Sequence, residues 1–172
     1  MKSTLLRPNR SGGEPARVVK LAIGDLVVYG THGAGPITAR ETRPVLGEEQ
    51  IVVVVALAHG LSVELPLARA EESLRPVADE DEIARLGVVL RSEATLDPDS
   101  WLKRQRAVRE KLGTALGLAE VVSEAAQRPT LAPSERELVR RAKDLLAVEI
   151  GLSRGEDPSA AAAWIDEQLV HG

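Results

Sequence analysis

The spacing of apolar residues changes once along the chain, near Asp79, and this change limits the possible folds more than any other feature. Before it, from Val18 to about Val77, short apolar runs rich in β-branched residues alternate with glycine and proline, a pattern typical of strands joined by tight turns. After it, apolar residues recur every three or four positions, as they do on one face of a helix. We therefore expect an α+β protein, with a β unit first and a helical unit second.

Five short strands with tight turns are expected in the β unit. The clearest is Gln50–Leu57, because its apolar residues are β-branched in unbroken succession. The full set is Val18–Ile23, Leu26–Tyr29, Pro36–Thr42, Gln50–Leu57 and Leu61–Leu65, with Leu74–Val77 as a further candidate that would close the sheet. Pro44 and Gly47 place a hairpin loop over Arg43–Glu49. Strands this short suggest a small antiparallel β-barrel of the SH3/Tudor type.

The helical unit is expected to form a compact bundle of four or five short helices. They span Asp81–Arg91, Asp97–Leu112, Leu116–Gln127, Ser134–Ile150 and Ser159–Val170. Asp97 is a good N-cap for the second of these helices, and Pro98 suits its first turn. Ser134 is expected to cap the fourth helix, and Gly151 is expected to turn the chain after it.

These patterns predict three segments. Residues 1–17 combine proline, glycine, serine and arginine and read as a flexible tail, residues 18–78 form the β unit, and residues 79–172 form the helical unit. Cysteine is absent, which excludes disulfides and thiolate metal sites. No apolar run approaches the ~20 residues of a membrane span, and Leu5-Leu6 is followed at once by Arg7-Pro8, so no signal peptide is expected. We expect a cytoplasmic protein with no membrane partner, monomeric because no long unpaired apolar face is evident.

Charge is spread unevenly along the chain. The net charge is −4, but thirteen acidic residues face five basic ones between Glu41 and Asp99, and residues 103–111 are strongly basic. Local patches decide contact with nucleic acid more than net charge does.

The basic stretch begins beside Trp101, one of only three aromatic residues in the chain. Lys103, Arg104, Arg106, Arg109 and Lys111 follow it, opposed only by Glu110. A flat apolar ring beside a cluster of cations suits a wedge in the minor groove of DNA, in which cations hold phosphates and the ring separates a base step. Trp101 also shares one helical face with Val108 and Leu112, so it could instead head a stripe of core residues. The residues alone leave both interpretations open and favour the core, since such stripes usually mean burial.

No catalytic or metal-binding pattern is found. His32, His59 and His171 do not share a strand or helix at ligand spacing. The glycines from Gly30 to Gly35 resemble a phosphate loop only superficially, because no Lys-Ser/Thr and no helix follow them. We therefore expect a binding protein that is not an enzyme and needs no cofactor.

Several short motifs, taken in order, resemble the CarD/CdnL-type transcription regulators. They are Gly24-Asp25-x-Val27-Val28-Tyr29, Thr31-His32-Gly33-Ala34-Gly35, Glu41-Thr42-Arg43, the strand end Val63–Pro66, Ser100-Trp101 followed by basic residues, Leu131-x-x-Ser134-Glu135 and Lys143-x-Leu145-Leu146. The resemblance spans roughly Leu21 to the C-terminus. It implies a Tudor-like module that docks on the β subunit of bacterial RNA polymerase, and a helical domain that meets promoter DNA at the upstream edge of the transcription bubble. Such proteins stabilise the open promoter complex.

By position, the resemblance assigns Trp101 as the minor-groove wedge and Lys103, Arg104 and Arg106 as the basic residues beside it. With the family included, the DNA-wedge interpretation of Trp101 becomes the preferred one. Arg43 matches a polymerase-facing basic position. Glu64, however, stands where relatives can carry a basic residue, and Gly30 stands where they often have proline. Either the polymerase contact at Glu64 has been re-paired with a basic partner, or the chain is a diverged paralogue, an interaction adaptor whose barrel binds another protein and whose Trp101 lies in the core.

Overall fold

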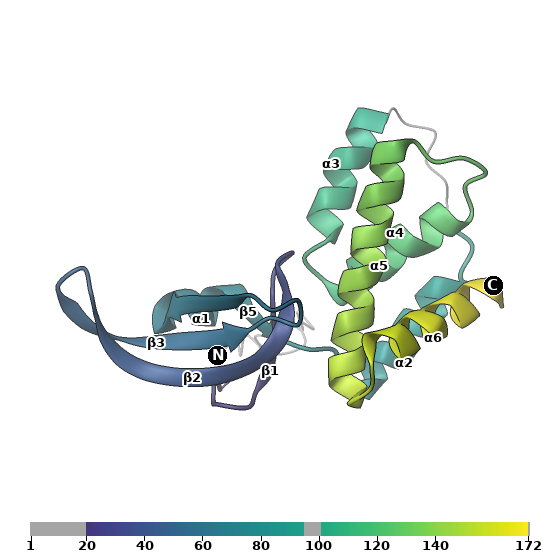
Figure 1. Ribbon diagram of the computed structural model, residues 1–172. Coiled ribbons are helices and arrows are strands. Elements are labelled where there is room, and N and C mark those ends of the chain that lie inside the picture. Colours follow the sequence, from purple (N-terminus) through teal and green to yellow (C-terminus); the bar gives the residue numbers. More distant parts are fainter. Residues whose placement is uncertain (1–19, 95–100, 172) are drawn as a thin grey trace, which may run out of the picture.

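The computed structural model describes residues 20–94 and 101–171, apart from the side chains of residues 101 and 102. Within these residues a five-stranded antiparallel sheet comes first and a group of helices follows (Figure 1). The predicted α+β fold, with a small Tudor-like sheet before a helical bundle, is confirmed. The described residues up to Ala78 are termed the β module below, and those from Asp79 onward the helical module.

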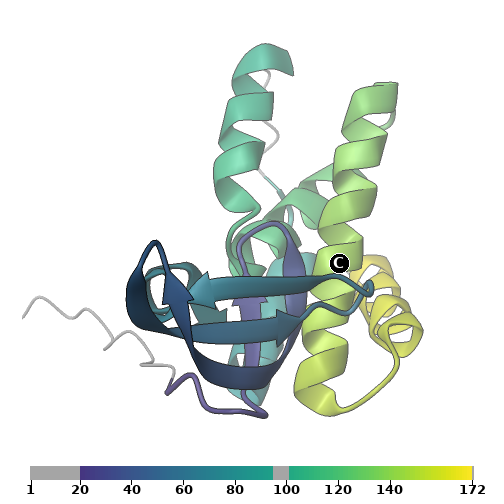
Figure 2. The same ribbon diagram turned by 60° about the vertical axis from the view of Figure 1, so that its left-hand side comes forward.

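The sheet has the strand order β4-β3-β2-β1-β5. Its strands are β1 Leu26–Tyr29, β2 Gly33–Val45, β3 Glu48–Ala56, β4 Ser62–Pro66 and β5 Leu74–Pro76, and helix α1, Leu67–Ser73, joins the last two. The first residues of β2 pair with β1 and the rest pair with β3, with a register shift between Ile37 and Ala39. Such a bulge bends a strand and increases its twist. The sheet is accordingly strongly curved (Figure 2).

Two predictions about the β module are wrong, and one helix in it was not predicted. Lys20–Asp25 contains no strand, because Leu21 and Gly24 have positive φ and the Asp25 carboxylate accepts a hydrogen bond from the Ala22 N–H, 2.9 Å away. The rest of the predicted Val18–Ile23 strand lies outside the described residues. The hairpin loop is shorter than predicted: only Leu46 and Gly47 separate β2 from β3. Helix α1 was missed, although its leucine, alanine and glutamate residues favour a helix.

The core of the β module lies on the inner face of the curved sheet. Its buried members are Leu21, Val27, Ile37, Val53, Val55, Leu57, Leu65, Ala70 and Leu74. Helix α1 contributes one of them, Ala70, which explains why this helix lies against the sheet.

The helical module contains five described helices. They are α2 Glu80–Arg91, α3 Trp101–Lys111, α4 Ala115–Ala126, α5 Pro133–Arg154 and α6 Pro158–Val170. Their buried aliphatic residues form a second core, centred on Ile83, Leu86, Leu146, Ile150 and Ile165. No helix of the described segments has both the length and the apolar character needed to cross a membrane.

The ends of α5 differ from the prediction. Ser134 does not cap this helix: Ala132 is the N-cap residue, and its N–H donates to the Glu135 carboxylate at 2.9 Å. The helix also continues through Gly151 and ends at Gly155, which has a φ of 66°. Gly151 serves packing instead, since a Cβ there would lie 2.9 Å from the Glu156 carbonyl oxygen. The predicted N-cap Asp97 and its neighbour Pro98 lie outside the described residues.

Candidate functional site

Helix α3 carries the residues predicted to meet DNA, and its last turn is held firmly in the bundle. Lys111 Nζ lies 2.9 Å from Glu120 and 3.5 Å from Glu124, both on α4. The hydrogen bond to Glu120, with help from Glu124, raises the pKa of Lys111, so this amine is a cation at neutral pH. Leu112, just beyond the helix, is buried. From this anchored end α3 extends away from the sheet (Figure 1).

The stripe predicted from Trp101, Val108 and Leu112 is only partly tested. Leu112 belongs to the core of the helical module, and Val108 packs against that core. Trp101 is the first residue of α3, but its side chain is not among those that the structure describes. The choice between a wedge and a core residue therefore stays a prediction.

The structure does not place the predicted basic residues of α3 on a single face. Lys103 and Arg106 are exposed, as is Arg109, and these three residues are spaced i, i+3 and i+6. Arg106 and Arg109 have no ion-pair partner within residues 20–94 and 101–171. Lys103, Arg106 and Arg109 are termed the basic face of α3. Arg109 belongs to the cation cluster noted in the sequence, but it was not among the positions that the resemblance assigned to DNA contact.

Arg104 points to the other side of α3. Its guanidinium lies 3.4 Å from the Glu135 carboxylate on α5, and only 24% of the Arg104 side chain and 13% of the Glu135 side chain are exposed. Both residues line a groove of about 220 Å³ between α3, α4 and α5. Arg104 therefore helps to attach α3 to α5.

Arg43 and Glu64, the two residues predicted to face the polymerase, lie in contact with each other. Arg43, on β2, reaches across β3 to Glu64 on β4, and its Nη1 lies 3.1 Å from both carboxylate oxygens. Its Nη2 also lies 2.6 Å from Glu41. These two carboxylates, Glu41 first, raise the pKa of Arg43.

Glu41, Arg43 and Glu64 are termed the sheet ion cluster. About half of each side chain is exposed, and the cluster carries one net negative charge. Since β4 is an edge strand of the sheet, Glu64 lies beside backbone groups that another chain can reach. Within the sheet Glu64 is thus paired with Arg43. Whether Glu64 also meets a basic partner on the polymerase stays a prediction.

The histidines of the β module have structural contacts. His32 stacks on Tyr29, with ring centroids 4.8 Å apart, and the ring of His59 lies against Gly33. The described part of the chain contains no group of three histidine, aspartate or glutamate residues arranged to hold a metal ion.

Comparison with protein families gives two matches along the chain. Residues 21–78 match the CarD-like/TRCF RID domain, and residues 86–166 match the CarD C-terminal domain. The first match covers the sheet and α1, and the second runs from α2 into α6. Together the two matches cover most of the chain. They follow each other in the order that the sequence motifs predicted. The chain therefore belongs to the CarD family.

Proposed function

We propose that this protein is a non-enzymatic transcription regulator that bridges bacterial RNA polymerase and promoter DNA. Residues 18–78 act as the polymerase-binding domain and contact the β subunit, whereas residues 79–172 act as the DNA-binding domain. The protein then stabilises the open complex from the upstream edge of the bubble. The observation that carries this proposal is the presence of both CarD-family domains, in sequence, on one chain.

The basic face of α3 supports the DNA-binding part of the proposal. Phosphates are held by cations that are exposed and not already neutralised. Arg106 meets both conditions, and so does Arg109. Trp101 would lie at the far end of the same helix, where a ring can reach a base step in the minor groove. Arg104 is expected to contribute less, because Glu135 already neutralises it.

Decay of the open complex after a heparin challenge tests the proposal, with full-length protein and bacterial RNA polymerase holoenzyme. The native protein should lengthen the lifetime, and Trp101→Ala should remove most of that effect. The double variant Arg106→Gln/Arg109→Gln should weaken DNA binding at every sequence. It should also reduce the slope of log affinity against log salt by about two, because each lost phosphate contact removes about one.

A matched control changes the same charge elsewhere on the helical module. Arg85→Gln/Arg136→Gln removes two exposed arginines from α2 and α5 and should leave the salt slope unchanged. Equal slopes for the two double variants would contradict a role for the basic face of α3. An unchanged open-complex lifetime with Trp101→Ala would contradict the wedge.

The sheet ion cluster favours a second candidate, the interaction adaptor. It gives the exposed sheet surface a net negative charge where relatives of the family can carry a basic residue. A charge of the wrong sign at an interface can cost several kcal/mol. Binding of the full chain to RNA polymerase distinguishes the candidates. If neither the native protein nor Glu64→Arg binds, the adaptor is favoured, whereas binding by Glu64→Arg alone would indicate a paralogue with altered docking.

A further inference from the structure

The two modules have separate cores, except that Ala78, at the end of the β module, packs in the core of the helical module. The covalent connection between β5 and α2 is short, comprising only Val77, Ala78 and Asp79. A short link keeps two bodies close together but does not fix their relative orientation. The orientation must therefore come from contacts across the junction.

One such contact is an ion pair between Arg75 on β5 and Glu149 on α5. It is bidentate: Nη1 lies 2.6 Å from Oε1, and Nη2 lies 2.9 Å from Oε2. Glu149 is only 1% exposed, the most deeply buried charged residue of the described chain. Two parallel hydrogen bonds fix the angle between the two groups as well as their distance.

The same pair also holds the link and the end of α3. Glu149 Oε1 accepts a hydrogen bond from the Ala78 N–H at 2.9 Å, and the Ser153 hydroxyl donates to the Ala78 carbonyl at 2.5 Å. The N–H and the carbonyl of Ala78, the middle residue of the link, are thus both hydrogen-bonded to side chains of α5. Arg75 Nε in turn donates to the Gly113 carbonyl at 3.2 Å, two residues after the end of α3.

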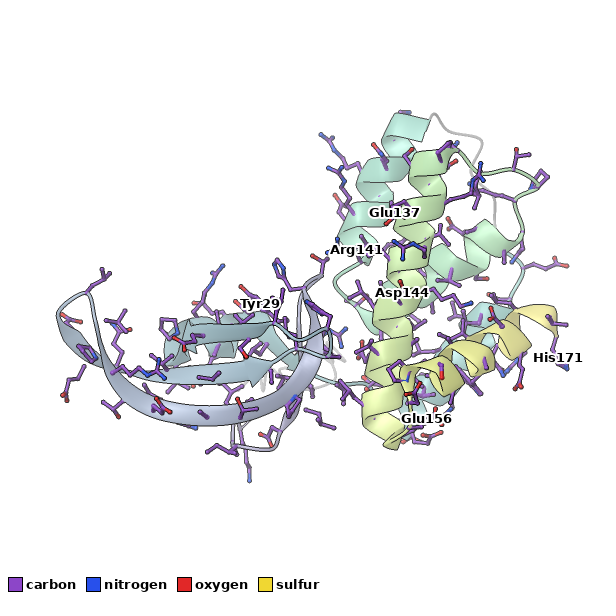
Figure 3. All side chains as sticks on the ribbon, viewed as in Figure 1. Tyr29, Glu137, Arg141, Asp144, Glu156 and His171 are labelled. Carbon is purple, nitrogen blue, oxygen red and sulfur yellow. The ribbon has the colours of Figure 1, made fainter. Side chains whose placement is uncertain are left out.

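A second connection lies on the other side of the junction. Arg141 on α5 donates to the Thr31 carbonyl in the β1–β2 turn at 3.0 Å. Arg141 crosses a groove of about 420 Å³ that lies between this turn and α5. Figure 3 shows Arg141 and Asp144 on the part of α5 that faces the sheet. Arg141 is exposed, so this bond competes with water and should restrain the junction less than the buried pair does.

We propose that Arg75 and Glu149 are positioning residues that set the direction of α3 relative to the sheet. The pair joins β5 to α5, fixes the link, and attaches the end of α3 to the β module through a single guanidinium. The two modules consequently move as one body, although their cores are separate. Neither residue needs to touch polymerase or DNA for this role.

The consequence for transcription rests on the proposed function. If the sheet is bound to polymerase, a fixed junction presents the basic face of α3 to DNA in one orientation. A loose junction would have to be ordered on binding, and that ordering costs conformational entropy. Loss of the pair should therefore reduce the effect on the open complex while leaving each separate binding surface intact.

The absence of native cysteine allows a direct test by paired spin labels. Labels are introduced through Ala68→Cys on α1 and Glu167→Cys on α6, both exposed and in different modules. The test variant is Arg75→Met/Glu149→Gln, which leaves no buried charge unpaired and keeps an acceptor for the Ala78 N–H. The control is Arg69→Met, which removes an exposed arginine of the β module whose ion pair, among the described residues, is with Glu72.

The labelled native protein should give a narrow distribution of distances between the modules. The control should match it, and the test variant should broaden it at least twofold, with circular dichroism showing that both modules stay folded. Glu149→Gln alone provides a milder variant and should give an intermediate width. A broad distribution in the native protein would overturn the proposal whatever the variants do, and so would an unchanged width in the folded test variant.

The open-complex assay separates this proposal from the proposed function. With an active native protein, the test variant should shorten the open-complex lifetime at least threefold while its affinities for DNA alone and for polymerase alone stay within twofold. Retention of the full lifetime would contradict the positioning role. If the native protein itself has no effect on the open complex, the proposed function fails, but the distance measurement still decides whether Arg75 and Glu149 fix the junction.

Discussion

Gly117, in the first turn of α4, lies where the chain folds back closely on the end of α3. A Cβ at this position would lie only 2.0 Å from the Lys111 carbonyl oxygen, whereas a Cβ at Gly113 would meet no atom within 4 Å. Backbone cannot move aside as a flexible side chain can, so Gly117→Ala should destabilise the protein by about 1–3 kcal/mol. Urea unfolding measures the change. Gly113→Ala is the control, and equal losses for the two variants would show that the contact is not what requires glycine.

Leu46 occupies an unfavourable backbone conformation at the tip of the β2–β3 hairpin. Its φ is 54° and that of Gly47 is 87°, and two positive φ values in a two-residue turn are the type I′ pattern that Asn-Gly prefers. The Leu46 side chain is fully exposed, so no packing compensates for the strain. Leu46→Asn should therefore stabilise the protein by about 1 kcal/mol.

Thermal and urea unfolding of Leu46→Asn test this expectation. Leu61→Asn serves as the control, because Leu61 is also an exposed leucine beside a turn but has no positive φ. If both variants change stability equally, removal of an exposed leucine would explain the effect and the strain would not.

The same turn explains one error of the sequence interpretation. Leu-Gly is not a recognised type I′ signal, so Pro44 and Gly47 together appeared to mark a long loop. Pro44 is instead accommodated within β2. As a result Arg43 lies on a strand, from which it reaches Glu64, a contact that the sequence pattern alone could not predict.

At the scale of elements, α2 begins directly after the junction and has a complete capping box. The Asp79 carboxylate accepts from the Glu82 N–H at 2.8 Å, and the Glu82 carboxylate accepts from the Asp79 N–H at 2.9 Å. Asp79→Ala removes the first of these bonds and should reduce the free energy of unfolding by about 1 kcal/mol. Asp81→Ala changes an exposed aspartate of the same turn, so a smaller loss in urea unfolding is expected. A loss equal to that of Asp79→Ala would contradict the capping role.

The ion pair between Glu80 and Arg154 joins α2 to the last turn of α5. Arg154 Nη2 lies 2.7 Å from the Glu80 carboxylate, and this hydrogen bond lowers the pKa of Glu80. A carboxyl group whose pKa is depressed in the folded state stabilises that state above its unfolded pKa, and the contribution is lost as the pH falls through the folded value. The contribution of Glu80 should therefore be complete at neutral pH, begin to fall near the ordinary glutamate value of about 4.5, and be lost only below the lowered pKa of the folded state.

Carbon-detected NMR titration of the Glu80 carboxyl group measures this effect. The pKa should lie below the ordinary glutamate value in the native protein and return toward it in Arg154→Gln. An unchanged pKa in the variant would assign the shift to another cause. Because Arg154 also lies 4.8 Å from the centre of the Trp164 ring, Trp164 fluorescence shows whether the local packing survives the substitution.

The helices were predicted more accurately than the strands. Periodicity identified all five described helices of the helical module, because each buries one apolar stripe. The sequence predicts the end of α5 near Gly151, because nothing in the sequence indicates that a neighbouring segment packs closely against this residue. The division of the basic residues between two sides of α3 likewise depends on Glu135, more than twenty residues away in sequence.

At the scale of the whole molecule, the sequence indicates two units but not how they are arranged. Arg75 and Glu149 resemble ordinary surface charges in the sequence, and they are brought together only when the modules pack against each other. The change of apolar spacing near Asp79 therefore predicts the order of the modules. Their orientation depends on contacts between residues that are distant along the chain.

Separate cores joined by a buried ion pair also predict how the molecule unfolds. Unfolding either module breaks the bonds of Glu149 to Arg75, and loss of one partner of a buried pair typically costs about 3–5 kcal/mol. Each module therefore stabilises the other, and the native chain should unfold in one cooperative transition. Arg75→Met/Glu149→Gln removes this coupling without leaving a buried charge, so the modules should then unfold separately.

Two probes can follow the modules independently. Both tryptophans belong to the helical module, so their fluorescence reports its unfolding, and amide NMR signals of β3 report the unfolding of the sheet. The two urea midpoints should coincide in the native protein and in Arg69→Met but separate in the double variant. Coincident midpoints in the double variant would mean that the remaining contacts, such as the bond of Arg141 to Thr31, couple the modules sufficiently without the buried pair. Midpoints that already differ in the native protein would mean that the buried pair orients the modules without making their unfolding cooperative.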